Sequence, residues 1–269
     1  MIRPAKARQP GTPVAECHAE SVQIAQPESE LDGATRPAWL ARVVLPDDLH
    51  VRRTPRPAPA GREIAIAPRA IGVNLDVPPI SLGWELSGVV IRAGGAFQIG
   101  DPVMGVTDHD SDPFMGVTDH GVSLGEVVAP AARFVKLPAG WSFEQGAAFP
   151  VSYLHAFELV AVMGRARPGM RVQVHGAASA LGRAALQIAG ALGCELIEAA
   201  EGTAVLGVNL DYLFDDPAHL CQRFEEILAL PGVCPSVGAL FPVEEMREAL
   251  ALLQSGQNAG KVVLAVDPP

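Results

Sequence analysis

One repeated segment of the chain carries side chains that could do acid–base chemistry. Residues 101–120 read DPVMGVTDHDSDPFMGVTDH, in which the phrase D-P-[VF]-M-G-V-T-D-H occurs twice with a period of eleven residues. Each copy ends in an Asp–His pair, and the second pair is Asp119 and His120. A carboxylate beside an imidazole suits general acid–base catalysis near neutral pH. Sequence neighbours point to opposite faces of a strand, so an acid of one copy would have to meet an imidazole of the other. A replicated surface loop is the competing interpretation.

The elements that would position such residues change in character along the chain. Residues 1–37 are rich in Pro, Ala, Gln and Glu without a sustained period, which predicts an irregular extension. From residue 39 short β-rich runs alternate with Gly and Pro, and the runs are LARVVL, REIAIAPRAIGV, SGVVIRAGG, GEVVAP and RFVKLP. This pattern is typical of a small β-barrel or an open sandwich.

The back half of the chain has helical and α/β signals. Ser142 and Gln145 form a capping signature ahead of a helical run that extends through PVSYLHAFELVAVMG. The strand MRVQVHG, the helix AASALGRAALQIAGALG and the strand CELIEAA then predict a βαβ unit. Further along, we expect strands at VLGVNL, PSVGALF and KVVLAV, and helices at PAHLCQRFEEILAL and PVEEMREALALLQSG. The fold class is therefore α/β.

Composition limits the classes of function. The 269 residues are 49% hydrophobic, which is ample for a core, and their net charge of -10 argues against binding nucleic acid or an anionic membrane. There is no leader pattern and no apolar run of about 18 residues, so we expect a cytoplasmic protein. The four cysteines lack CxxC spacing, which favours neither a disulfide framework nor a zinc lobe.

Several long segments, in the right order, resemble the medium-chain dehydrogenase/reductase superfamily, above all quinone oxidoreductases and the enoyl reductase domains of polyketide synthases. They are RAIGVN (69–74), LGWELSGVV (82–90), IGDPVMG (99–105), LPAGWSFEQGAAFPVSYLHAF (137–157), RPGMRVQVHGAASALGRAALQIAGALG (167–193) and FPVEEMREALALLQSGQNAGKVVL (241–264). The resemblance implies a GroES-like β-barrel domain over 38–150, with 241–269 packing back on it. It also implies a truncated Rossmann-like α/β remnant over 151–240. In the family, hydride transfer from NADPH takes place in the cleft between these two parts.

The metal-binding branch of the family does not fit. Trp84 stands where that branch has a zinc-ligating His, and an indole cannot ligate zinc. No other Cys/His cluster compensates, so we expect no metal.

The nucleotide turn departs from the family pattern. The family's Ala-x-x-Gly-Gly-x-Gly turn reads here as Gly176, two alanines, Ser179, Ala180, Leu181 and Gly182. Middle glycines let the backbone approach the pyrophosphate, whereas Ser179 and Ala180 place Cβ atoms there. We therefore treat this turn as a remnant.

Two further departures from the family pattern also argue against nucleotide binding. Glu198 and Glu201 stand where a reader of the 2′-phosphate of NADP would be basic, although a carboxylate could bind the ribose of NAD. Only about 70 residues remain for a nucleotide-binding sheet, roughly half of what two βαβαβ halves need. We expect no cofactor, with NADPH or NADH as the alternative.

Three residues become catalytic candidates through the resemblance. His155 stands where the family has Thr near the reactive end of the cofactor, so it could act as a general acid or base. Tyr153 could donate a hydrogen bond to a carbonyl, and the amide of Asn74 could orient one. The competing interpretations are a helix-packing His, a core Tyr and an Asn in a turn.

Four residues are assigned to the substrate side. Trp84 would offer a flat apolar face for stacking, and Glu85 follows it at the border of the family's active site. Leu75, which replaces a proton-donating residue of the family, and Met104 complete the set. Core packing is the alternative for Trp84, and a structural role is the alternative for Glu85.

The favoured function is cyclisation, by cycloaddition or Michael-type ring closure, of a small unsaturated polyketide-like substrate in the former reductase cleft, without a cofactor. One alternative is an NAD(P)H-dependent enoyl or quinone reductase. Another is a non-catalytic binding or scaffold protein. Family members often dimerise through the nucleotide domain, so a homodimer is one option.

Overall fold

The computed structural model describes residues 40–44, 49–53, 62–74, 82–107, 122–123, 126–197 and 216–266, and side chains within 62–74, 85–107, 126–197 and 216–266. The chain divides into two units, 1–36 and 37–269, and all described residues belong to the second. The predicted extension, the second copy of the repeat and the strand expected at VLGVNL fall outside the described residues.

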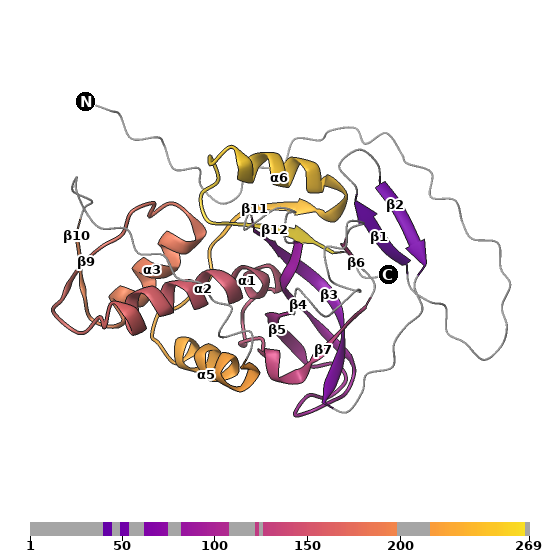
Figure 1. The fold of residues 1–269 in the computed structure, drawn as a ribbon, viewed down its shortest axis with the longest axis horizontal. Coiled ribbons are helices and arrows are strands. Elements are labelled where there is room, and N and C mark those ends of the chain that lie inside the picture. Colours follow the sequence, from indigo (N-terminus) through magenta and orange to yellow (C-terminus); the bar gives the residue numbers. More distant parts are fainter. Residues whose placement is uncertain are drawn as a thin grey trace, which may run out of the picture. The chain divides into compact units, whose positions relative to one another are not determined.

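The largest sheet has the strand order β11-β12-β3-β4-β5-β8, with β7 paired to β3 (Figure 1). Its neighbours are antiparallel except β11 and β12, which run parallel. The strands are β3 (Glu63–Val73), β4 (Leu82–Arg92), β5 (Pro102–Val106), β7 (Val127–Pro130), β8 (Phe134–Lys136), β11 (Val237–Pro242) and β12 (Lys261–Ala265). A short 3-10 helix, η1 (Ala131–Arg133), joins β7 to β8. The last strands of the chain thus complete the barrel sheet begun by β3.

The barrel sheet covers an apolar core. Ile64, Ile66 and Ile71 of β3 pack with residues of the neighbouring strands and have no exposed surface. The helix α6 (Met246–Gln254) follows η3 (Val243–Glu245) and contributes Met246 and Ala249 to the same core. Strands rich in β-branched residues therefore form the barrel sheet that the sequence predicts, although β3 and β4 are each eleven residues long.

A separate antiparallel sheet has the order β2-β1-β6, with β1 at Leu40–Val44, β2 at Leu49–Arg53 and β6 at Val122–Ser123. The sequence predicts β1, whereas β2 and β6 were not expected from it. The first repeat copy, which was expected to form a turn, contains strand β5.

Two consecutive helices replace the single long helix expected after Ser142. The helix α1 (Phe143–Ala148) begins with the predicted capping box of Ser142 and Gln145. The helix α2 (Pro150–Phe157) starts afresh with Pro150 at its first position. Proline inside a helix lacks an N–H and clashes with the preceding turn, so one helix ends before it and another begins. A π-helix, η2 (Glu158–Met163), continues α2.

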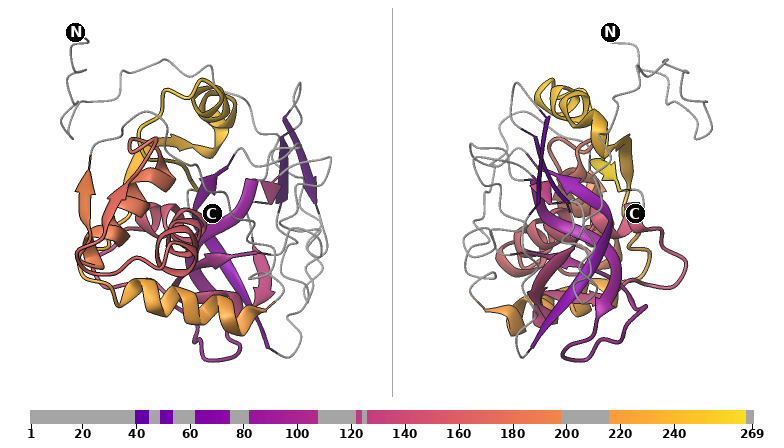
Figure 2. Two further views of the ribbon diagram at one scale, coloured as in Figure 1. Left: turned by 60° about the vertical axis from the view of Figure 1, so that its left-hand side comes forward. Right: turned by 90° about the vertical axis from the view of Figure 1, so that its right-hand side faces the viewer.

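The predicted βαβ unit is present. Strand β9 (Arg171–Gln173), helix α3 (Ala180–Ala191) and strand β10 (Glu195–Ile197) follow in order, and the two strands pair in parallel. They form a sheet of their own, and Figure 2 shows these salmon-coloured strands apart from the purple strands of the barrel.

The helix α5 (Pro217–Leu228) and the helix α3 both pack against α2 (Figure 1). Phe224 of α5 lies 5.8 Å from Phe149, measured between ring centroids, and both rings are fully buried. This helical core is distinct from the barrel core. The structure confirms the fold class, a GroES-like barrel combined with a Rossmann-like α/β part, while the predicted domain boundaries remain a prediction.

Candidate functional site

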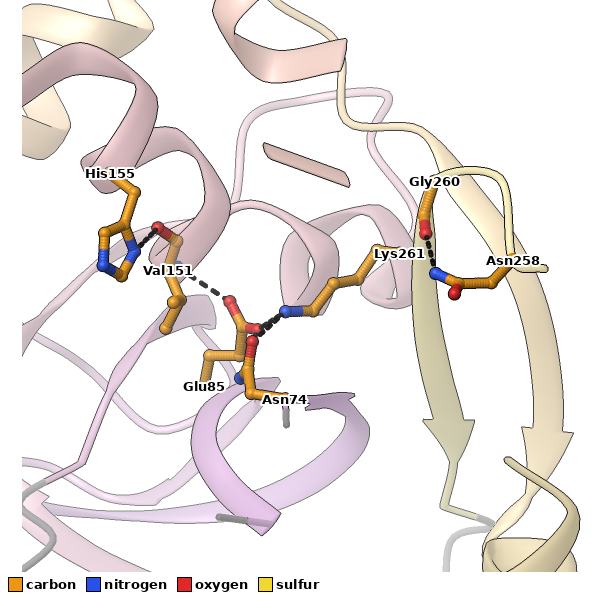
Figure 3. A network of polar contacts seen from close by, with 7 residues as sticks. All are labelled: Asn74, Glu85, Val151, His155, Asn258, Gly260 and Lys261. Carbon is orange, nitrogen blue, oxygen red and sulfur yellow. Dashed lines mark hydrogen bonds and ion pairs between the residues drawn. The ribbon is translucent and has the colours of Figure 1, made fainter. Parts of the chain in front are cut away.

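A buried polar network joins the barrel to α2 (Figure 3). Glu85 on β4 forms an ion pair with Lys261 at the start of β12, and the two side chains are 0% and 4% exposed. The side-chain N–H of Asn74 donates to Glu85 Oε1 at 3.0 Å, and Lys261 Nζ donates to Asn74 Oδ1. The pairing of β3 with both β4 and β12 brings these three residues together.

The other carboxylate oxygen of Glu85 caps α2. Val151 N–H donates to Glu85 Oε2 at 2.8 Å. Pro150 has no N–H, so Val151 supplies the first backbone donor of this helix. The N-cap residue, Phe149, makes no side-chain capping bond. A carboxylate from another element therefore takes the capping role, where the helix dipole also favours negative charge.

His155 lies one turn further along α2 and is half-buried. Its Nδ1 is 3.1 Å from the carbonyl oxygen of Val151 (Figure 3). A carbonyl oxygen only accepts hydrogen bonds, so this contact requires the proton on Nδ1. The neutral ring then has its lone pair on Nε2, the nitrogen that would exchange a proton in acid–base chemistry.

Tyr153 has an interior role in this structure. Its ring stacks on Phe149 with a centroid distance of 5.0 Å, and its hydroxyl donates to Gln187 Oε1 at 2.7 Å. The carbonyl of Cys234 lies 3.1 Å from the same hydroxyl. Burial raises the pKa of Tyr153, the nearby Cys234 raises it further, and the hydrogen bond to Gln187 opposes both. The hydroxyl thus ties α2 to α3 and to the loop before β11.

The remaining predicted residues are placed as follows. Met104 is fully buried on β5, packed in the core beneath the helices. The backbone of Trp84 belongs to β4, but its side chain lies outside the description. Leu75, Asp119 and His120 lie outside the described residues altogether. The structure thus brings together Asn74, Glu85 and, through Val151, His155.

Sequence reasoning missed Lys261. A signal was present, because a lysine opens the otherwise apolar strand KVVLA, and lysine is rarely buried unless it is paired. No local pattern indicates which acid would pair with it, since Glu85 lies far away in the chain.

The turn between β9 and α3 occupies the place of the phosphate-binding turn in a Rossmann-like unit, and we refer to it as the phosphate-binding turn for that position. Gly176 has a φ of 65°, a conformation that favours glycine, and a Cβ on Gly182 would lie 2.2 Å from the carbonyl oxygen of Gly176. Glycine at these two positions lets α3 start close to the end of β9, as a dinucleotide-binding turn requires.

Ser179 and Ala180 replace the middle glycines of the family's turn, and their Cβ atoms were expected to hinder a pyrophosphate. Ser179 is the N-cap of α3, and its Oγ accepts from Gly182 N–H at 3.0 Å. The backbone N–H groups of Ala180 and Leu181, in the first turn of α3, have no acceptor within the helix by geometry. Because residues 176–179 are exposed, these donors suit the pyrophosphate of a dinucleotide.

The sequence segment that contains this turn carries no acidic residue. Residues 159–194 contain neither Asp nor Glu in a chain whose net charge is -10, and they include four arginines at positions 165, 167, 171 and 183. Arg183, in the first turn of α3, donates from Nε to the carbonyl of Ala178 at 3.2 Å. Residues 198–215 lie outside the described residues. They include Glu198 and Glu201, which the resemblance places near the adenosine of a nucleotide.

The phosphate-binding turn is also tied to the start of β12. Gly260 N–H donates to the carbonyl of Ala178 at 2.7 Å, and the side-chain N–H of Asn258 donates to the carbonyl of Gly260 at 3.0 Å (Figure 3). Lys261 follows directly in the chain. The turn and the buried network are therefore linked through one short backbone segment.

No group of three or more His, Cys, Asp or Glu able to hold a metal ion occurs among the described side chains. Within the same part of the chain, no helix has both the length and the apolar character to cross a membrane.

No protein-family model matches the chain. A pikromycin polyketide synthase component of Streptomyces venezuelae is 35% identical over 169 residues, which is 62% of this chain and 4% of that protein. The mouse protein named synaptic vesicle membrane protein VAT-1 homolog-like is 27% identical over 201 residues, 67% of this chain and 45% of that protein. The chain thus spans less than half the length of either relative.

Solved structures have the same fold. Human VAT-1 homolog-like protein has a TM-score of 0.70 at 20% identity, covering 86% of this chain and 99% of that one. CurK enoyl reductase has a TM-score of 0.68 at 17% identity, covering 84% and 99%. These structures show the fold, which the chain shares with proteins of the medium-chain dehydrogenase/reductase superfamily. Other solved structures with this fold are a quinone oxidoreductase and the CurF ER cyclopropanase from the curacin A biosynthetic pathway.

These structures correct the expectation that the protein uses no cofactor. The quinone oxidoreductase of Thermus thermophilus, solved with NADPH, has a TM-score of 0.62 at 24% identity and covers 86% of this chain and 100% of that one. A mycobacterial protein of the same fold was also solved with NADPH. The expectation was wrong because it equated a shortened sheet with a lost site, whereas the turn that would hold the phosphates keeps its two essential glycines.

Proposed function

We propose that the protein is an NAD(P)H-dependent reductase of an unsaturated carbonyl compound, of the enoyl or quinone type. The observation that carries the proposal is the β9–α3–β10 unit, whose glycine turn leaves the start of α3 open to solvent. Arg183, which contacts the turn at Ala178, would add positive charge beside the phosphates. Ala180 and Leu181 would hold the pyrophosphate through their backbone N–H groups.

When bound, a reduced nicotinamide would supply a hydride to the unsaturated carbonyl compound. The chain must then provide a proton for the α-carbon or the carbonyl oxygen of the substrate. His155 is the residue we assign to this step, because its proton on Nδ1 is held by Val151 and its Nε2 can carry the second proton. After transfer, Nε2 regains its proton from water, so the ring returns to its starting state.

Nucleotide titration tests the cofactor part of the proposal. NADPH and NADH are added separately, and binding is followed by the fluorescence of the reduced nicotinamide. We expect saturable binding of at least one, and the Gly182→Ala variant should bind it more weakly because the turn is displaced. If neither nucleotide binds, the reductase proposal is overturned, and the non-catalytic alternative, a scaffold or a protein that binds some other molecule, remains.

Product analysis tests the reaction. An enoyl thioester and a benzoquinone are offered with the nucleotide that binds, and the product mass is measured. Reduction adds two hydrogens to the substrate, whereas ring closure, the reaction favoured by the sequence alone, leaves the mass unchanged. A product of unchanged mass that still required the nucleotide would replace reduction by cyclisation.

A further inference from the structure

Burying the ion pair of Glu85 and Lys261 costs free energy, and hydrophobic replacements of such pairs are often neutral or stabilising. Its side chains are 0% and 4% exposed, so neither can meet a substrate directly. The carboxylate also holds the first backbone N–H of α2. The helix that this carboxylate caps carries His155, which suggests a role for the pair beyond stability.

We propose that Glu85 and Lys261 are positioning residues that fix the first turn of α2 and so hold His155 with its proton on Nδ1. The functional meaning of this arrangement rests on the proposed reductase activity, in which Nε2 delivers the proton. The tautomer itself can be measured without any cofactor or substrate.

The first step of the argument concerns the start of α2. Phe149 provides no side-chain cap and Pro150 provides no N–H, so Glu85 is the acceptor that holds Val151 N–H. Without this acceptor, the N–H would be buried and unsatisfied, or the first turn would fray. Lys261 holds Glu85 oriented toward the helix, because its Nζ pairs with the other carboxylate oxygen.

The second step concerns the imidazole. The carbonyl of Val151 faces His155 Nδ1 at 3.1 Å only while the first turn stays helical. If that turn frays, the carbonyl moves and the ring loses the contact that favours a proton on Nδ1. Loss of this contact removes the preference that it creates for the Nδ1–H tautomer, so the tautomer reports on the network.

Two double variants separate positioning from general stability. Glu85→Met with Lys261→Met removes both charges and the acceptor at once, leaving no stranded charge. Glu85→Gln with Lys261→Met removes the same charges but keeps a side-chain oxygen for Val151 N–H. The matched control is Glu158→Met with Arg223→Met, a second ion pair whose side chains are 1% and 16% exposed. It lies beyond the C-terminal end of α2 and does not touch the first turn.

Nitrogen-15 NMR of histidine-labelled protein gives the decisive readout, with the His155→Gln spectrum assigning one of the seven histidines. We expect Nδ1–H in the wild type, its loss in the Glu85→Met/Lys261→Met variant, its recovery in the Glu85→Gln/Lys261→Met variant, and no change in the control. Persistence of Nδ1–H in the first variant would overturn the proposal, as would an Nε2–H ring in the wild type.

If the Glu85→Met/Lys261→Met variant does not fold, amide hydrogen exchange on the wild type decides. The Val151 amide should exchange slowly, and fast exchange would refute the proposal. Kinetics give an independent measurement. We expect kcat to fall about tenfold or more, and the KM for NADPH to change much less, because neither substituted side chain belongs to the phosphate-binding turn. Without any nucleotide-dependent turnover the proposed function fails, while the tautomer measurement still decides the positioning role.

Discussion

Replacing Gly182 with Ala adds one methyl group where α3 passes the turn that follows β9. The new Cβ would lie 2.2 Å from the carbonyl oxygen of Gly176 and 2.8 Å from the Cα of Ala177. Both contacts are to backbone atoms, so no side-chain rotation relieves them. The start of α3 must move away from the turn.

The free energy of this change follows from two opposing effects. Overpacking of a tight contact costs about 1–3 kcal/mol. Alanine in place of glycine inside a helix recovers about 0.5–1 kcal/mol. We therefore expect Gly182→Ala to destabilise the protein by up to about 2.5 kcal/mol, the overpacking cost less the helix-propensity gain. Gly190 lies in the same helix, and a Cβ there meets nothing within 4 Å. Gly190→Ala should therefore stabilise the protein by about 0.5–1 kcal/mol.

Urea unfolding of the two variants and the wild type measures this difference, because the slope of the free energy with urea should stay the same. Nucleotide titration of the same samples then tests whether the displaced turn binds NADPH more weakly, while Gly190→Ala should bind as the wild type does. If Gly182→Ala is as stable as Gly190→Ala, the claim that α3 and the turn are in close contact at Gly182 is refuted. If the Gly182→Ala variant is destabilised but binds NADPH with unchanged affinity, the turn does not take part in nucleotide binding.

Three further predictions concern the elements around the site. Ser142→Ala removes half of the capping box and should lower the free energy of unfolding by about 1 kcal/mol in urea melts, whereas an unchanged melt would mean that Gln145 alone holds the start of α1. Burial raises the pKa of Tyr153 above 10.0, so the stability it contributes is full below pH 10.0 and is lost as the pH rises further. Tyr153→Phe should therefore flatten the alkaline limb of a stability–pH curve, and an identical limb contradicts this. Arg223→Met leaves the buried carboxylate of Glu158 without its guanidinium partner and should cost about 3 kcal/mol, measured by thermal unfolding. If the free energy of unfolding falls by less than about 1 kcal/mol, the pair of Glu158 and Arg223 is no stronger than an ordinary surface ion pair.

Much of the fold could be predicted from local sequence. The capping pattern at Ser142 places the start of α1 correctly, because capping depends on residues three apart. The βαβ unit was also predictable, since its periodicity changes from strand to helix and back within about 30 residues. The break between α1 and α2 could have been predicted from Pro150, which cannot lie inside a helix.

The site could be predicted only in part. His155, Asn74 and Glu85 were singled out from the sequence, but their connections were not. Tyr153 and Met104 were predicted to be site residues, but both are buried in the core. The sequence does not reveal whether an aromatic or a thioether side chain reaches the surface. The prediction of a cofactor-free protein failed for a related reason, since chain length does not show which part of a shortened sheet is kept.

The sequence by itself determined the superfamily resemblance, the α/β class and the glycines of the phosphate-binding turn, because each depends on residues close together in the chain. Only the tertiary structure decided that Glu85 caps α2 from 66 positions away and that Lys261 reaches Asn74 across 187 positions. Such contacts follow from the register of β3 against β4 and β12. Strand register is set by the packing of the whole sheet, so no local pattern specifies it.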